Sequence, residues 1–205
     1  MRISPVIRWP NLLCHYKPVE ASQYEQKNQA SNITQLINSL GYSQAHIIGY
    51  SSGAWLAAGL VKYYPKSLSS LVIGGWDVEN GLPEGPNGKL EFDTFLEYAK
   101  ITAPELTDGI TPDTESAVRA YFNEISAYDG FYDSAQLTQI NIPKLFGAGL
   151  EDVYYRQLNS WSNANKYTFV SVAGEHVSAI LKLEPAIIRK ISEFIIQAEL
   201  EQLCH

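Results

Sequence analysis

Short apolar runs alternate with segments of helical periodicity along most of the chain. The runs cover residues 45–50, 70–75, 144–149 and 166–173, and the helical segments cover residues 24–40, 54–64 and 184–203. Strands that are apolar on both faces are typical of a parallel sheet covered by helices. The pattern therefore predicts an α/β fold with a mostly parallel sheet flanked by helices.

The alternation is interrupted between residues 76 and 142. This stretch is acidic and aromatic, contains the sequence ENGLPEGPNG, and has helical periodicity only around residues 90–100 and 114–126. We interpret it as an inserted, mostly helical cap at residues 77–139, between two parts of a core at residues 1–76 and 140–205. Its aromatic residues either line an apolar pocket or form a small core of the cap itself; they are Trp76, Phe92, Phe95, Tyr98, Tyr121, Phe122, Tyr128, Phe131 and Tyr132.

Composition narrows the classes of protein and of partner. The 205 residues are 45% hydrophobic, which is enough for one globular domain with a substantial core. The net charge of -7 argues against nucleic acid as a partner, because proteins that bind it normally have a basic face. No apolar run has the length of a membrane span, and no secretory leader follows Met1. Cys14 and Cys204 indicate thiols of a reducing compartment, so we expect a cytoplasmic protein with no membrane partner.

The sequence HIIGYSSGAW places a serine between glycines where a predicted strand gives way to a helix. Gly49-Tyr50-Ser51-Ser52-Gly53 matches G-x-S-x-G, the pattern of a sharp strand-to-helix turn that displays a nucleophilic serine. We expect both glycines to avoid clashes that bulkier residues would cause in such a turn. A turn in which the serine only caps the helix is the alternative. The position between strand and helix favours Ser51 as a nucleophile.

A serine hydroxyl needs a base to remove its proton, and the chain has 4 histidines. His46 lies within the strand before the serine, His15 in an irregular segment, and His205 at the last position. His176 instead follows the last predicted strand, in a loop before the terminal helix. Because parallel strands end at the same edge of a sheet, we expect His176 beside Ser51.

The acid that orients the base should lie at the same edge of the sheet. Asp152 follows the strand at residues 144–149 and meets this requirement. Asp77, which follows the strand at residues 70–75, is the alternative, whereas the side chain of Glu151 should start from the opposite side. The pattern favours Asp152. We expect no cofactor and no metal, because the sequence has no phosphate-binding loop and no metal-binding spacing of cysteine or histidine.

Together, the segments HIIGYSSG, LVIGGWD, IPKLFGAGLED and VAGEHVSAI resemble the motifs of the α/β-hydrolase superfamily, in the chain order serine, acid, histidine. The resemblance extends weakly upstream to His15-Tyr16-Lys17-Pro18 and covers roughly residues 12–203. It implies a serine hydrolase that cleaves a small carboxylic ester or a related acyl compound. A serine at the elbow disfavours the dehalogenase and epoxide-hydrolase branches, which use a carboxylate.

The resemblance also implies a role for each residue of the site. Ser51 would attack the carbonyl carbon, and His176 would carry the proton. Asp152 would hold His176 in the right tautomer, and the backbone N–H of Ser52 would stabilise the oxyanion.

The chain departs from the family at its N-terminus. Family members usually have three or four more strands, and the loop after the third donates a second N–H to the oxyanion hole. Residues 2–7 match at most a remnant of the fourth strand, so only the Ser52 amide is carried over. We therefore expect a partial, N-terminally truncated α/β-hydrolase fold. A minimal hydrolase that completes the sheet edge with residues 1–14 is the alternative.

Two expectations follow from this departure. The strand at residues 45–50 should be an uncovered edge, which favours self-association through that edge. Loss of one oxyanion donor lowers turnover by about 10²–10³-fold in known cases. A catalytically silent fragment or interaction module is therefore the second hypothesis, beside the serine hydrolase.

Overall fold

A four-stranded parallel sheet forms the centre of the computed structural model, which describes residues 21–85, 88–102, 104, 107–127, 134–181 and 185–203. The sheet has the order β1-β2-β5-β6, and its strands are β1 (Ala45–Tyr50), β2 (Leu68–Gly74), β5 (Lys144–Gly149) and β6 (Thr168–Val172). Every residue of β2 is buried, as a strand covered on both faces requires. All four predicted strands are confirmed: β1 and β5 have the predicted ends, and the ends of β2 and β6 move by one or two residues.

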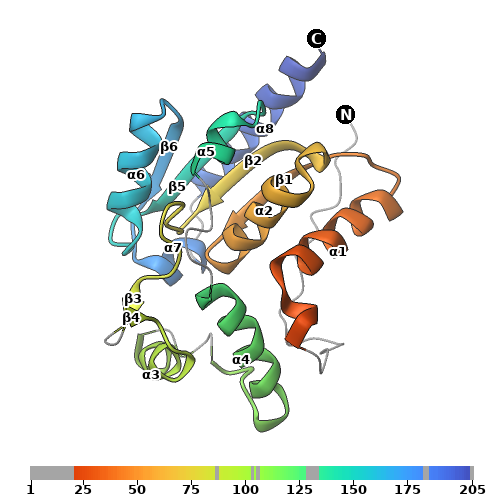
Figure 1. The fold of residues 1–205 in the computed structure, drawn as a ribbon. Coiled ribbons are helices and arrows are strands. Elements are labelled where there is room, and N and C mark those ends of the chain that lie inside the picture. The colour runs from red at the N-terminus through yellow and green to blue at the C-terminus, as the bar shows by residue number, and fades with distance from the viewer. Residues whose placement is uncertain are drawn as a thin grey trace.

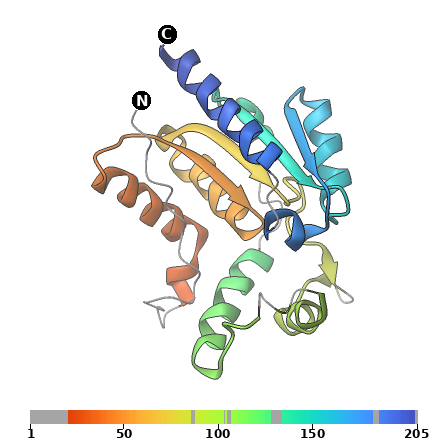
Figure 2. The same cartoon turned by 180° about the vertical axis from the view of Figure 1, so that it is seen from behind.

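Helices cover both faces of this sheet (Figure 1). On one face, α1 (Gln26–Ser39) packs against α2 (Ser52–Tyr63), which packs against β1 and β2. On the opposite face, α8 (Pro185–Leu203) lies against β2 and β6, as the view from behind shows (Figure 2). The helices predicted at residues 24–40, 54–64 and 184–203 are thereby confirmed, and so is the arrangement of a sheet between helix layers.

The strand β1 lies at one edge of the sheet. Among the strands in the described ranges it pairs with β2 alone, in a parallel register that aligns Ile48 with Val72. Ile48 is 57% exposed, whereas Val72 on the neighbouring strand is buried. The edge position is as predicted. Association through this edge remains a prediction.

The interrupted stretch lies mostly beyond the end of the sheet at which the strands finish, whereas its last helix lies back beside α2 (Figure 1). It contains the short strands β3 (Glu84–Gly85) and β4 (Gly88–Lys89), then α3 (Phe92–Thr102), α4 (Pro112–Ser126) and α5 (Ser134–Gln139). The helix α4 begins two residues earlier than predicted, because Thr111 and Thr114 form a reciprocal cap with Pro112 at the first position.

Aromatic rings join the cap helices to each other and to the sheet layer. The Phe122 ring of α4 stacks on Phe95 at 4.9 Å between centroids and meets the edge of Phe92 at 5.6 Å. The preceding residue, Tyr121, packs edge-on against the buried Trp55 of α2, with centroids 5.5 Å apart. These contacts favour the reading in which the aromatic residues form a core of the cap. The boundaries of the cap as a separate unit stay a prediction.

Several short helices were not predicted. They are η1 (Ala21–Tyr24), η2 (Pro65–Ser67), α5, α6 (Tyr155–Ala164) and α7 (His176–Leu181). The placement of His176 in a loop was therefore wrong, since it is the first residue of α7. The predictions for residues 2–7, Cys14, His15, Tyr128, Phe131, Tyr132, Cys204 and His205 fall outside the described residues. In the part of the chain that the structure describes, no helix combines the length and apolar character of a membrane span.

Candidate active site

The turn between β1 and α2 holds Ser51 in an unusual backbone conformation. Its φ is 55° and its ψ is -123°, in a region that residues with a side chain seldom occupy. The Ser51 N–H donates to the carbonyl of Gly74 on the neighbouring strand at 2.9 Å, and its carbonyl accepts from the Ala54 N–H at 2.8 Å. These bonds fix the sharp turn that projects the side chain away from the sheet.

Only one of the two motif glycines is required by space. A Cβ on Gly49 would collide with the Gly53 carbonyl oxygen and would lie 2.9 Å from the Ala54 Cα. A Cβ on Gly53 would have no heavy atom within 4 Å apart from its own neighbourhood in the helix. The expected clash is therefore confirmed for Gly49 and is wrong for Gly53.

The structure brings Ser51, His176 and Asp152 together. His176 Nε2 lies 2.9 Å from Ser51 Oγ, and His176 Nδ1 lies 3.0 Å from Asp152 Oδ2. The three residues come from the ends of β1, β6 and β5, respectively. They therefore form one continuous hydrogen-bonded chain from hydroxyl to carboxylate.

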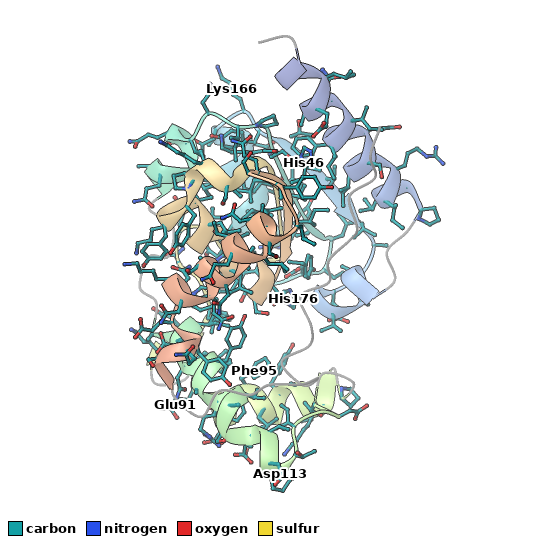
Figure 3. The ribbon with its side chains drawn as sticks, turned by 90° about the vertical axis from the view of Figure 1, so that its right-hand side faces the viewer. His46, Glu91, Phe95, Asp113, Lys166 and His176 are labelled. Carbon is teal, nitrogen blue, oxygen red and sulfur yellow. The ribbon has the colours of Figure 1, made fainter. Side chains whose placement is uncertain are left out.

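Main-chain bonds between two loops explain why the acid and the histidine meet. The Leu150 N–H donates to the Val172 carbonyl at 2.8 Å, and the Glu151 N–H donates to the Gly174 carbonyl at 3.1 Å. The loops after β5 and β6 are thus joined by main-chain hydrogen bonds beyond the end of the sheet. Figure 3 shows the result, with His176 between the sheet layer and the cap helices that carry Phe95 and Asp113.

Asp152 is a buried carboxylate with three donors. Its side chain is 0% exposed; Oδ1 accepts from the Tyr154 N–H at 3.0 Å, while Oδ2 accepts from the Tyr50 hydroxyl at 2.9 Å and from His176. Burial alone would raise the pKa of Asp152, but the hydrogen bond and electrostatic interaction with His176, together with the hydrogen bonds from Tyr154 and Tyr50, outweigh it, and the net pKa is lowered. The carboxyl is therefore ionised at neutral pH.

Two tyrosine rings enclose the His176 imidazole. The Tyr50 ring lies 5.3 Å from it and the Tyr154 ring 5.4 Å, both between centroids. The imidazole side chain keeps 23% exposure, so one part of it stays open. An imidazolium that forms here is stabilised by the Asp152 carboxylate and by its contact with the two aromatic rings.

The other predicted residues have different surroundings. Asp77 accepts hydrogen bonds from the Glu79 and Asn80 N–H groups at 2.9 and 3.1 Å, so it caps its own turn. The described hydrogen bonds of the His176 ring go to Ser51 and Asp152 and none to Asp77. Glu151 is exposed. The geometry therefore favours Asp152 over the alternative.

His46 lies at the other end of the sheet, beside α8 (Figure 3). Its Nδ1 is 2.8 Å from Ser70 Oγ, and its Nε2 is 2.6 Å from Glu199 Oε1. Ser70 is fully buried, so no substrate reaches this serine. His46 links β1 to β2 and α8, which agrees with its interpretation as a packed residue.

Ser52 is the first residue of α2, and its N–H is one of the four at a helix start that have no partner within the helix. Its side chain hydrogen-bonds the Tyr121 hydroxyl, which comes from the cap helix α4. Among the described residues, no cluster of three or more His, Cys, Asp or Glu has the arrangement of a metal site. The sequence analysis named Tyr121 only among the aromatic residues of the cap, and it missed Tyr50 and Tyr154 as neighbours of the site. Their only signal was the position of Tyr50 inside the motif.

Comparison with solved structures gives similar folds at low sequence identity. A hydrolase from Pseudomonas aeruginosa PA01 matches with a TM-score of 0.62 and 18% identity over 84% of this chain and 72% of its own. An enol-lactonase from Burkholderia xenovorans LB400 matches with a TM-score of 0.63 and 14% identity, over 84% and 74%. A thermophilic esterase from Thermogutta terrifontis gives 0.63 and 17%, over 85% and 73%.

These likenesses confirm the fold class that the sequence predicts. No family model matches the sequence, and no curated protein matches it.

Proposed function

We propose that this chain, which has the α/β-hydrolase fold, is a serine hydrolase that cleaves a carboxylic ester or a related acyl compound. The observation that carries the proposal is the hydrogen-bonded chain from Ser51 through His176 to Asp152, at 2.9 and 3.0 Å. A nucleophile bonded to a base that is itself bonded to an orienting acid is the arrangement that nucleophilic catalysis needs.

The ionised carboxylate determines which nitrogen of His176 carries the proton. Asp152 Oδ2 only accepts hydrogen bonds, so Nδ1 is the protonated nitrogen that donates to it. Nε2 then presents a lone pair to the Ser51 hydroxyl. The tautomer is the one in which His176 acts as a base toward Ser51.

The reaction then takes place in two halves. As Ser51 Oγ forms a bond to the carbonyl carbon, its proton moves to His176 Nε2, and the carbonyl oxygen becomes an oxyanion. The bond to the alcohol breaks, and the alcohol leaves with the proton from Nε2. Water then attacks the carbonyl carbon of the acyl-serine as it loses a proton to Nε2. The bond from that carbon to Ser51 Oγ breaks, Nε2 returns the proton to Oγ, and the acid leaves.

The oxyanion is assigned to the start of α2. The N–H of Ser52 follows the nucleophile, and the positive end of the helix dipole lies at the same place. The Tyr121 hydroxyl that bonds the Ser52 side chain holds this first turn in place from the cap. Both features support stabilisation of negative charge beside Ser51.

A fluorophosphonate probe tests the proposal directly. We expect the probe to label Ser51 in the intact chain and Ser51→Ala to abolish both labelling and turnover of a chromogenic short-chain ester. Because structural neighbours include a lactonase and an esterase, a lactone is assayed beside the ester. Ser160→Ala, at an exposed position of α6, is the matched control and should retain full labelling.

Two outcomes would contradict the proposal. Turnover by Ser51→Ala at the wild-type rate would show that the reaction uses another residue. A folded wild-type chain that takes no label and cleaves neither substrate would favour the catalytically silent protein.

A further inference from the structure

The Tyr50 hydroxyl has one proton and two acceptors. It lies 2.9 Å from Asp152 Oδ2 and 2.8 Å from the main-chain oxygen of His176. Both of these oxygens can only accept, so the single phenol proton is shared between them. Tyr50 therefore contacts the acid and the residue that carries the base with the same atom.

The Tyr50 ring packs against two positions, 74 and 75, where any side chain larger than that of glycine would collide with it. A Cβ on Gly74 would lie 2.6 Å from the Tyr50 Cδ2, and one on Gly75 would lie 2.6 Å from its Cζ. Gly75 also has a φ of +55°, a conformation that suits glycine. The ring also packs against the His176 imidazole, with centroids 5.3 Å apart and ring planes at 34°. Gly74, the last residue of β2, and Gly75 thus leave room for the Tyr50 ring, and Gly75 also leaves room for the His176 imidazole.

We propose that Tyr50 is the positioning residue of the site, which fixes Asp152 and the first residue of α7 to the strand that carries Ser51. The proposal rests on the proposed function, since it assigns a role relative to the same three residues. Tyr50 immediately precedes Ser51, so one rigid element holds the nucleophile and sets the places of its two partners.

The charges around the hydroxyl keep it a donor. Burial, the Asp152 carboxylate and the more distant Glu175 all raise the pKa of Tyr50, so the phenol stays protonated throughout the pH range of a folded protein. The groups that face Asp152 are His176, Tyr50 and Tyr154. The pKa of Tyr154 is itself raised by burial and by the charges of Asp152 and Asp77. Of these neighbours, Tyr50 and His176 donate through side chains to Oδ2.

Tyr50→Phe tests the proposal, because it removes the hydroxyl and keeps the ring in its place against Gly74 and Gly75. We expect kcat for the ester to fall on the order of 10-fold with KM unchanged, as loss of a hydrogen bond to a charged group predicts. Replacement by 3,5-difluorotyrosine, which restores a phenol, should recover most of the activity. Tyr167→Phe is the matched control: its ring packs against Phe146 and Trp161, and its loss of a hydroxyl should leave kcat unchanged.

A measurement that needs no turnover separates this proposal from the proposed function. The ¹³C resonance of the Asp152 carboxyl, assigned with Asp152→Asn, reports its titration in the folded chain. We expect it to titrate at a higher pH in Tyr50→Phe than in the wild type and in Tyr167→Phe, because the ionised form has lost a donor.

The outcomes are distinct for the two proposals. A carboxyl that titrates at the same pH in all three proteins, or a Tyr50→Phe enzyme with wild-type kcat, would overturn the role of Tyr50. A shifted carboxyl in a chain that no probe labels would support the role of Tyr50 in placing Asp152 and refute the hydrolase.

Discussion

Replacing Asp152 with asparagine turns the carboxylate, which accepts three hydrogen bonds, into an amide with one oxygen and one NH₂ group. The amide oxygen can replace Oδ1 and keep the bond from the Tyr154 N–H at 3.0 Å. The NH₂ group then occupies the place of Oδ2 and faces His176 Nδ1 and the Tyr50 hydroxyl, which are both donors in the wild type. The hydroxyl can turn its proton to the His176 carbonyl, but the imidazole must change its tautomer.

The changed tautomer decides the size of the effect on catalysis. With the proton on Nε2, the imidazole presents a donor to Ser51 Oγ where a base is needed. For the same substitution in a serine protease, the loss in kcat is about 10⁴-fold with the geometry retained. We expect a loss on the order of 10³–10⁴-fold here, equivalent to about 4–5.5 kcal/mol in the activation free energy. KM should change little, because the acid does not contact the substrate.

Stability should show the same carboxylate through its pH dependence. The pKa of Asp152 in the folded chain lies below its ordinary value of 3.8, so the ionised group stabilises the fold at pH values above 3.8. This contribution is lost as the pH falls through the folded value. The free energy of unfolding of Asp152→Asn should therefore lack this part, and its difference from the wild type should shrink in acid.

Steady-state kinetics with a chromogenic ester and urea unfolding at several pH values measure both effects. Asp77→Asn is the control, since Asp77 accepts bonds from its own turn and should leave kcat within about twofold of the wild type. If Asp152→Asn retained a tenth or more of wild-type kcat, the reasoning from the tautomer would be refuted. A large loss in Asp77→Asn alone would identify Asp77 as the acid.

Two further predictions concern the strand β1 and its turn. Gly49→Ala should lower the free energy of unfolding in urea by about 1–3 kcal/mol, because its Cβ meets the main chain of Gly53. Gly53→Ala should be neutral or slightly stabilising, and an equal loss for both variants would contradict this account. Association through the edge of β1 predicts a mass above that of the monomer in light scattering and a monomer for Ile48→Lys. A wild type that is monomeric at high concentration would refute it.

The sheet and the candidate site residues were predictable because the strands and the turn at Ser51 have local signals in the sequence. The run at residues 70–75 is apolar on both faces, and a short run of this kind is typical of a strand in a parallel sheet that helices cover on both sides. The turn at Ser51 is encoded within five residues. His176 and Asp152 could be placed because the ends of parallel strands meet at one edge, whatever the loops between them do.

The features that escaped prediction depend on distant contacts. The helix α6 has the sequence YRQLNSWSNA, in which Leu158 and Trp161 are the buried apolar residues, and it packs against β5. Two buried apolar positions in a mostly polar segment were too few to predict a helix from the sequence. The proposed role of Tyr50 depends on its contacts with Asp152 and His176, which lie 102 and 126 positions further along the chain. No pattern within the motif indicates where its hydroxyl lies, because the two loops that it joins are placed by the sheet.

The backbone of Ser51 also has a thermodynamic consequence. A residue with a side chain in this conformation costs about 1–3 kcal/mol, which glycine would largely avoid. The free energy of unfolding of an ordinary domain is about 5–15 kcal/mol, so this cost at a single position is a considerable fraction of the total. Selection for the most durable fold would therefore favour glycine at residue 51, and the presence of serine there records a requirement other than durability.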